Sequence, residues 1–196
     1  EMLRSLVGSE MCIRDRSGGL GSIAIQLAKH LGATVATTAG AGSAALVQSL
    51  GADVVIDYRQ QDFENVLRNY DVVLHSQDSK ALAKSLRVLK RGGQLVSVSG
   101  PPDPAFGETL RASGFLRMVF RLLSAGTRRR AQVLGIGYSF LFMRAQGSQL
   151  QEITRLVDAG AIRPVIDKVF PFDATNEAIA YVETGRAKGK VVVRVR

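Results

Sequence analysis

Apolar positions follow two alternating spacings over residues 20–99. Short runs of consecutive apolar residues, typical of buried parallel strands, alternate with segments in which apolar residues recur every three or four positions, typical of helices. The predicted strands are 33–37, 53–57, 71–75 and 94–99, and the predicted helices are 20–31, 43–50, 62–68 and 79–90. This order predicts an α/β fold with a doubly wound parallel sheet, in which all strand ends share one edge.

The pattern is less regular after Gly100. Three prolines at 101, 102 and 104 predict a loop, which leads to an expected helix over 115–123 and an expected sixth strand over 137–143. The remaining expected elements are a helix at 149–159, an apolar segment at 164–170, a helix at 176–183 and a strand at 191–195.

A glycine-dense turn, Ser17-Gly18-Gly19-Leu20-Gly21, leads directly into the first helix. Glycines let a backbone approach a ligand closely, and the amide groups at a helix N-terminus attract anions. Taken with the strand pattern that follows, the turn predicts a site for a dinucleotide pyrophosphate.

The segment before this turn does not have the expected pattern. A continuous apolar strand should lead into the glycines, but the chain reads Met11-Cys12-Ile13-Arg14-Asp15-Arg16. Asp15 takes the first position of a G-x-x-G-x-x-G pattern, where a carboxylate would repel a pyrophosphate. Either this site is impaired, or residues 1–16 are an atypical leader foreign to the domain.

Composition narrows the class of protein. A chain of 196 residues with 46% hydrophobic and 22% charged residues is typical of a globular protein, and no apolar run approaches the roughly 20 residues that span a bilayer. We therefore expect no membrane partner and a cytoplasmic location. The single Cys12 and two distant histidines offer no ligand set for zinc, so we expect no metal site.

The net charge of +9 includes a cluster of Arg117, Arg121 and Arg128–Arg130. Aromatic residues do not interleave with the basic ones as in a single-strand binder, so no nucleic-acid partner is expected. A solvated face or an acidic partner surface is the expected role of the cluster, and attraction of an anionic cofactor is the alternative.

Several motifs together resemble the zinc-independent, quinone-reductase-like branch of the medium-chain dehydrogenase/reductase superfamily, including the reticulon-interacting mitochondrial oxidoreductases. Besides the glycine turn, the matching segments occur in the family order over about residues 17–196. They are Leu50-Gly51-Ala52-Asp53-Val54-Val55-Ile56-Asp57-Tyr58, Leu89-Lys90-Arg91-Gly92-Gly93-Gln94-Leu95-Val96, residues 156–166 and residues 185–192.

The resemblance implies a domain division. Residues 17–163 would form a Rossmann-type dinucleotide-binding domain. Residues 164–196 would be the C-terminal remnant of a substrate domain, a segment that packs in relatives on an N-terminal catalytic domain missing from a truncated chain. A homodimer is also expected by resemblance.

The resemblance further implies NADPH as cofactor and hydride transfer to a small carbonyl or quinone substrate, without a catalytic residue that the sequence singles out. NAD enzymes usually carry an acid after the second strand, and residues 37–43 contain none, which leaves room for a 2′-phosphate. The expected cofactor-binding residues are Ser17, Gly18, Gly19, Leu20, Gly21, Thr38, Gly40, Ser43, Tyr58, Arg59, Ser99, Gly100, Ala187, Lys188 and Gly189.

Two other functions remain open from sequence. Residues 86–96 are also compatible with a methyltransferase that uses S-adenosylmethionine, although such enzymes usually have an acid after the second strand. A non-catalytic nucleotide-binding or interaction protein would keep the fold without turnover. His75, at the end of a strand, is expected to be a hydrogen-bonded structural residue rather than a catalytic acid.

Overall fold

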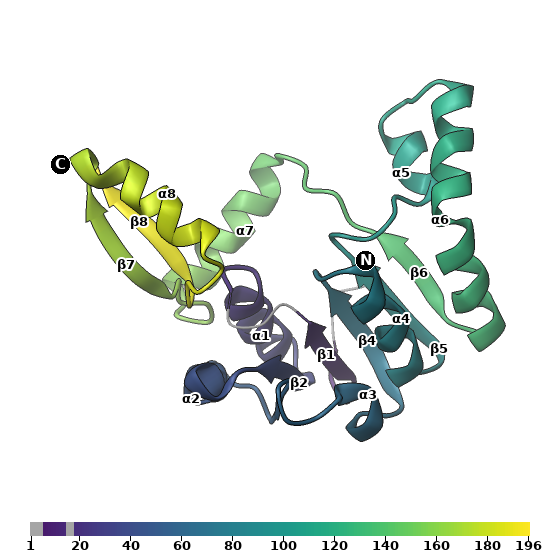
Figure 1. The fold of residues 1–196 in the computed structure, drawn as a ribbon, viewed down its shortest axis with the longest axis horizontal. Helices are drawn as coiled ribbons and strands as arrows, with labels where there is room; N and C mark the ends of the chain where they lie inside the picture. The colour runs from purple at the N-terminus through teal and green to yellow at the C-terminus, as the bar shows by residue number, and fades with distance from the viewer. Residues whose placement is uncertain (1–5, 15–17) are drawn as a thin grey trace.

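The centre of the fold is a six-stranded parallel sheet (Figure 1). The computed structural model describes residues 6–14 and 18–196. The strand order is β3-β2-β1-β4-β5-β6, and every neighbouring pair is parallel. The strands are β1 (Glu10–Arg14), β2 (Thr34–Ala39), β3 (Val54–Asp57), β4 (Tyr70–His75), β5 (Leu89–Ser97) and β6 (Gly137–Phe140). This order confirms the predicted doubly wound fold, whose chain direction across the sheet reverses between β1 and β4.

Helices cover both faces of the sheet. The helices of this domain are α1 (Gly21–His30), α2 (Ala41–Ser49), α3 (Phe63–Val66), α4 (Ser79–Val88), α5 (Pro104–Thr109), α6 (Gly114–Leu134) and α7 (Gly147–Asp158). Alternate strand residues belong to two separate apolar cores: Cys12 packs in the core with residues of α3, α4 and α6, whereas Met11 and Ile13 pack in the core with residues of α1 and α2. Because successive side chains of a strand point to opposite faces of the sheet, β1 contributes apolar residues to the cores on both faces.

Residues 10–14 form β1, the strand that the sequence pattern did not predict. Met11, Cys12 and Ile13 are buried, and the strand pairs with β2 on one side and β4 on the other. Three apolar residues suffice because hydrogen bonds from both neighbours satisfy the backbone of a central strand. The atypical sequence of residues 10–14 therefore does not prevent this segment from forming the central strand. Asp15 and Ser17 lie outside the described residues, and the prediction of an impaired site stays a prediction.

The segment after β5 contains more helix than expected. Asp103 accepts a hydrogen bond from the Phe106 backbone amide at 2.9 Å, and Pro104 takes the first helical position, so α5 begins where a loop was predicted. The next helix, α6, has 21 residues instead of the predicted nine-residue segment 115–123, and it ends at Gly135 in the left-handed conformation.

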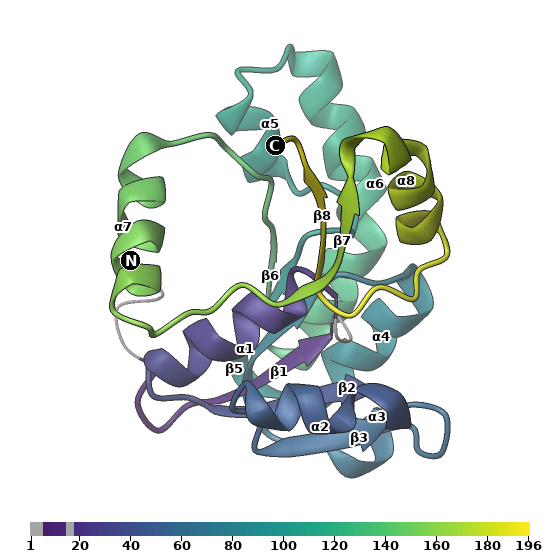
Figure 2. The ribbon, with the colours of Figure 1, turned by 90° about the vertical axis from the view of Figure 1, so that its left-hand side faces the viewer.

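The last part of the chain forms a small separate layer, which we call the C-terminal lobe (residues 164–196). It consists of β7 (Ile166–Pro171), the 3-10 helix η1 (Phe172–Ala174), α8 (Thr175–Glu183) and β8 (Lys190–Arg194). β7 and β8 pair in parallel as a two-stranded sheet. Figure 1 shows this lobe on the opposite side of the molecule from α5 and α6, and Figure 2 looks onto the lobe.

Candidate functional site

The glycine turn lies where α1 begins. Gly21 is the first residue of α1, and the Ser22 backbone amide donates to the Gly18 carbonyl at 3.1 Å. The first turn of α1 contains no acidic residue. Ser17 lies outside the described residues, but Gly18, Gly19, Leu20 and Gly21 together form a helix N-terminus of the kind that binds phosphate.

A lysine from the far end of the chain covers this turn. A Cβ atom added to Gly19 would lie 2.7 Å from the Lys190 ammonium nitrogen. A side chain at residue 19 would therefore displace the end of the Lys190 side chain from its position over the turn. Lys190 was not among the residues expected from sequence, and the available signal was its position directly after Gly189 in the C-terminal motif.

A second group of predicted residues gathers where β2 and β3 end. Gly40 is the N-cap of α2, and a Cβ atom there would lie 3.5 Å from the Tyr58 hydroxyl. The Arg59 guanidinium lies 5.9 Å from the centre of the Tyr58 ring. Lys188 reaches the start of α2, because its ammonium donates to the Gly42 carbonyl at 2.7 Å. The structure therefore brings Gly40, Tyr58, Arg59 and Lys188 to one edge.

Two other predicted residues, one at the end of β2 and one at the start of α2, are buried. Thr38 and Ser43 are buried, with 1% and 8% of their surfaces exposed. What this edge presents to solvent is accordingly the loop backbone and the side chains of Tyr58 and Arg59, not the Thr38 and Ser43 hydroxyls.

Ser99 and Gly100 lie beyond the end of β5. The Ser99 hydroxyl donates to the Gln77 carbonyl at 2.7 Å, and the Gly100 amide donates to the Ser97 hydroxyl at 2.8 Å. A Cβ atom at Gly100 would lie 2.7 Å from the Tyr138 hydroxyl, which itself donates to the Pro101 carbonyl at 2.6 Å. Burial, together with the negative charge of Asp103, raises the pKa of Tyr138 to about 12, so this hydroxyl stays protonated.

His75 is fully buried and structural. Its Nε2 atom lies 3.2 Å from the carbonyl oxygens of Gln77 and Asp78, and the Ser85 hydroxyl lies 3.3 Å from its Nδ1 atom. These contacts tie the end of β4 to α4 and agree with the structural role expected for His75.

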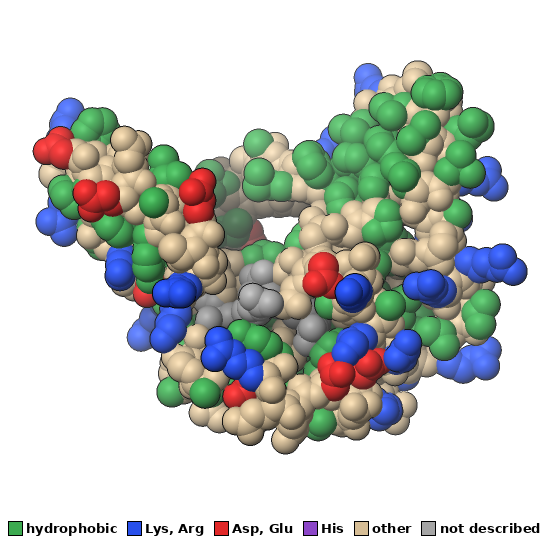
Figure 3. All heavy atoms as spheres, viewed as in Figure 1, with side chains coloured by type: hydrophobic (Ala, Val, Ile, Leu, Met, Phe, Trp, Pro, Cys, Tyr) green, Lys and Arg blue, Asp and Glu red, His purple; other side chains and the backbone are tan. Residues whose placement is uncertain are grey.

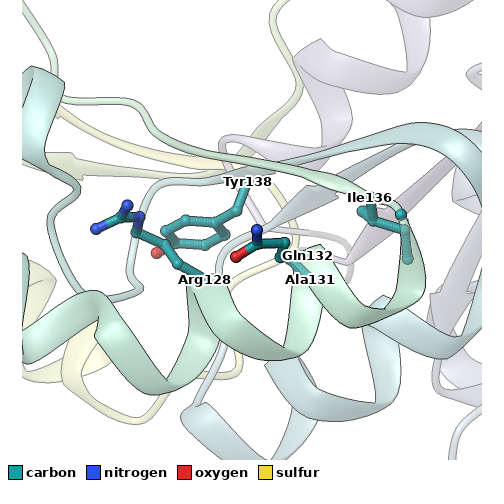
Figure 4. Close-up of a pocket in the computed structure, with 6 residues that line it drawn as sticks. Arg128, Ala131, Gln132, Ile136 and Tyr138 are labelled. Atoms are coloured by element: carbon teal, nitrogen blue, oxygen red, sulfur yellow. The ribbon is translucent and has the colours of Figure 1, made fainter.

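Two pockets lie on α6, away from the glycine turn. One, of about 510 Å³, is lined by Arg128 and Gln132 of α6 and by Tyr138 of β6 (Figure 4). The other, of about 320 Å³, lies between α4 and α6. Neither is lined by a residue predicted to bind the cofactor.

A hollow lies between the two raised parts of the molecule. Figure 3 shows this hollow between the C-terminal lobe and the α5–α6 region, with lysine and arginine side chains along its left rim. It lies beyond the carboxyl ends of the parallel strands, where sheets of this class bind their ligands.

Metal ligands do not converge in the part of the chain that the structure describes. No three His, Cys, Asp or Glu side chains there are close enough to hold an ion. Across residues 6–14 and 18–196, no helix has the length and apolar character needed to cross a bilayer.

Known proteins similar to this chain are dehydrogenases, oxidoreductases and reductases. The family described as zinc-binding dehydrogenase matches residues 50–193. The mouse (Mus musculus) NAD(P)H oxidoreductase RTN4IP1, mitochondrial, is 36% identical over 96% of this chain and 48% of its own length. The tomato (Solanum lycopersicum) 2-methylene-furan-3-one reductase is 33% identical over 95% of this chain and 40% of its own length.

A solved structure agrees in fold over the whole chain. The quinone oxidoreductase from Coxiella burnetii has a TM-score of 0.80 and 26% identity, and the match covers all of this chain and 55% of that one. The chain thus spans about half the length of the relatives it matches.

The expected cytoplasmic location was wrong. The mouse relative and the proteins of the same name from Bos taurus, Danio rerio and Homo sapiens are all named mitochondrial. Organelle targeting is carried by short segments outside the folded domain, so the composition of a nucleotide-binding fold does not reveal it.

Proposed function

Because the chain belongs to the zinc-binding dehydrogenase family, within the medium-chain dehydrogenase/reductase superfamily, we propose that it is the cofactor-binding part of an NADPH-dependent reductase. Its substrates are quinones or unsaturated carbonyl compounds. The same comparisons argue against a methyltransferase, since the mouse and tomato relatives are an oxidoreductase and a reductase.

The observation that carries the proposal is the position of two lysines from the C-terminal lobe. Lys190 lies over Gly19 of the glycine turn, and Lys188 hydrogen-bonds the Gly42 carbonyl beside Tyr58 and Arg59. An NADPH molecule carries negative charge at two places, the pyrophosphate and the 2′-phosphate of the adenosine ribose. Two cations at two separate phosphate positions fit that charge distribution.

The surrounding residues fit the same molecule. The amides of the glycine turn and Lys190 would hold the pyrophosphate, and a side chain at residue 19 would displace the Lys190 ammonium from this position. Gly40, Tyr58, Arg59 and Lys188 would surround the adenosine ribose, and residues 37–43 offer no carboxylate to repel a 2′-phosphate.

The hydride itself would come from the nicotinamide ring, and the protein would supply position and environment. Ser99 and Gly100 lie just beyond the end of β5, on the β4–β5 side of the reversal point in the strand order, where the nicotinamide would lie. The close approach of Gly100 to Tyr138 excludes a side chain there and leaves the backbone to face the ring.

Zinc does not fit the described residues, despite the description of the family. No three of the described His, Cys, Asp or Glu side chains lie close enough together to hold an ion, so we propose a zinc-independent reaction in which the carbonyl is not activated by a metal of this domain.

The C-terminal lobe supports a proposal about the longer relatives. Ile166, Val169, Phe172, Ile179 and Val182 are exposed on a unit of 33 residues. We propose that a further domain packs on this apolar surface and completes the substrate pocket, so that residues 164–196 belong structurally to that domain.

Calorimetric titration of the purified chain with NADPH, NADH and S-adenosylmethionine tests the assignment. We expect NADPH to bind at least about tenfold more tightly than NADH, because one charge-assisted phosphate contact contributes about 1.5–3 kcal/mol. Lys188→Met should weaken NADPH binding by about tenfold and leave NADH binding nearly unchanged.

Lys168→Met is the matched control. It removes a positive charge from the same lobe. The Lys168 ammonium, however, lies 4.0 Å from the centre of the Tyr181 ring, whereas the Lys188 ammonium donates to the Gly42 carbonyl. Equal losses for NADPH and NADH in Lys188→Met would refute the 2′-phosphate assignment. Binding of NADPH without turnover of a quinone or enone would support the non-catalytic alternative for this chain.

A further inference from the structure

The outer face of α6 carries an apolar stripe that the core does not use. Phe115, Met118, Leu122 and Val133 are each more than half exposed, and they recur at spacings that place them on one side of the helix. The opposite side packs on the sheet, where Ser124 and Ala131 are buried. One side of α6 therefore packs against the rest of the domain, and the apolar stripe on the other side belongs to neither apolar core.

An aromatic cluster holds this helix against α5. The Phe106 ring lies 5.5 Å from Phe120, 5.2 Å from Phe140 and 5.1 Å from Phe142, measured between ring centres. Such contacts fix α5, α6 and the end of β6 together. The stripe is thus presented on a firmly packed pair of helices, and Figure 3 shows hydrophobic side chains gathered over them.

The charges of the same region are almost all positive. Residues 104–134 contain six arginines, at 111, 117, 121 and 128–130, and one acidic residue, Glu108. Arg129 and Arg130 are exposed on the helix that carries the stripe. Long arginine side chains can lie beside an apolar surface while their guanidinium groups remain in a polar layer.

We propose that the outer face of α6, defined by Phe115, Met118, Leu122 and Val133 with the exposed Arg129 and Arg130, binds the surface of a bilayer containing anionic phospholipid. The helix lies flat in the headgroup layer: its apolar side chains enter the upper acyl region, and its arginines pair with lipid phosphates. This association is peripheral and does not depend on the proposed reductase activity.

Charge complementarity favours this occupant over a second copy of the chain. A two-fold interface brings the same face of each copy together, so Arg129 and Arg130 beside the stripe would meet the same two arginines of the other copy, and α6 contains no acidic residue to oppose them. An anionic membrane offers an acyl region for the apolar stripe and phosphate groups for the arginines at the same time. Nucleic acid would satisfy the arginines but would leave Leu122, Met118 and Val133 without an apolar partner.

Vesicle co-sedimentation of the purified chain is the test. Vesicles of phosphatidylcholine with about 30% phosphatidylglycerol are compared with vesicles of phosphatidylcholine alone, at low and at high salt. We expect binding to the anionic vesicles to be at least about tenfold stronger and to weaken with salt. Leu122→Glu and the double variant Arg129→Gln/Arg130→Gln should each reduce the partition coefficient by about tenfold or more.

Two matched variants separate this face from general surface effects. Ile179→Glu places a charge at a half-exposed apolar site on α8, and Arg155→Gln removes an exposed arginine from α7. Both should bind anionic vesicles as the parent chain does. Circular dichroism and thermal melting of every variant show whether the fold is retained.

Equal binding to both kinds of vesicle would overturn the proposal, as would equal losses in the control variants. So would an absence of vesicle binding, whether the chain is monomeric or self-associates in analytical ultracentrifugation. Dimerisation that Leu122→Glu abolishes, without vesicle binding, would instead assign this face to a second copy.

Discussion

The six-stranded sheet and the C-terminal lobe bury very different fractions of their apolar residues. In the sheet, Ile13, Val73 and Leu95 are completely buried between helices on two faces. Within residues 164–196, Ala178 alone is buried, and the larger apolar side chains of β7 and α8 remain half exposed. The comparison shows that the sheet can be stable through its own cores, whereas the lobe depends on what it contacts.

Polar groups near the candidate site connect the lobe to the sheet domain. Gln26 of α1 exchanges two hydrogen bonds with the Arg163 backbone, at 3.0 and 2.8 Å, where the lobe begins. Lys188 donates to the Gly42 carbonyl at the start of α2, and Lys190 lies over Gly19 of the glycine turn. The position of the lobe and the shape of the cofactor site are therefore linked.

The largest expected effect is in the sheet core. Leu95→Ala should lower the free energy of unfolding by about 2–5 kcal/mol, because it leaves a cavity where β5 packs beneath α4 and α6. Ile179→Ala, at a half-exposed position of the lobe, should cost less than about 1 kcal/mol. Denaturant titration of both variants measures the two changes in the free energy of unfolding. Similar losses at the two sites would show that the sheet core and the lobe do not differ in this way.

A smaller effect is expected where the two regions meet. Gln26→Ala should cost about 1–3 kcal/mol, since it leaves the Arg163 amide and carbonyl without these partners. We expect hydrogen exchange to accelerate in residues 164–196 while β4 and β5 stay protected. Gln48→Ala, at an exposed position of α2, is the control, and unchanged exchange in the lobe of Gln26→Ala would show that other contacts hold it.

The smallest effect concerns pH and the sheet domain alone. Burial by itself would raise the pKa of Asp53, but a 2.7 Å hydrogen bond from the Val35 amide and the Lys29 ammonium lower it below its usual value. The folded pKa is thus below the unfolded one. The stabilisation is present above the unfolded pKa of about 4 and is lost as pH falls through the folded value.

Asp53→Asn should therefore reduce the pH dependence of unfolding between about pH 5 and pH 2. The change should be less than about 1 kcal/mol, because water screens this partly exposed ion pair. Denaturant titrations of both proteins across this range provide the measurement. An unchanged slope in the variant would mean that Asp53 contributes nothing to acid sensitivity.

The sequence alone determined those helices and strands whose residues carry a clear local pattern. Apolar runs and three-to-four spacings predicted β2 to β5 and their helices, and the glycine turn predicted the start of α1, because these patterns depend on residues close together in the chain. The doubly wound fold followed from their alternation. The capping by Asp103 and Pro104 was also readable, but the neighbouring prolines indicated a loop more strongly.

Only the tertiary structure decided the features that depend on distant neighbours. Residues 10–14 form a strand because β2 and β4 lie on either side, which their own mixed sequence does not reveal. Thr38 and Ser43 are turned inward by the packing around β2, and Lys190 reaches Gly19 because the C-terminal lobe folds back over α1. Local patterns specify elements, whereas a site assembled from both ends of a chain exists only once the elements have packed.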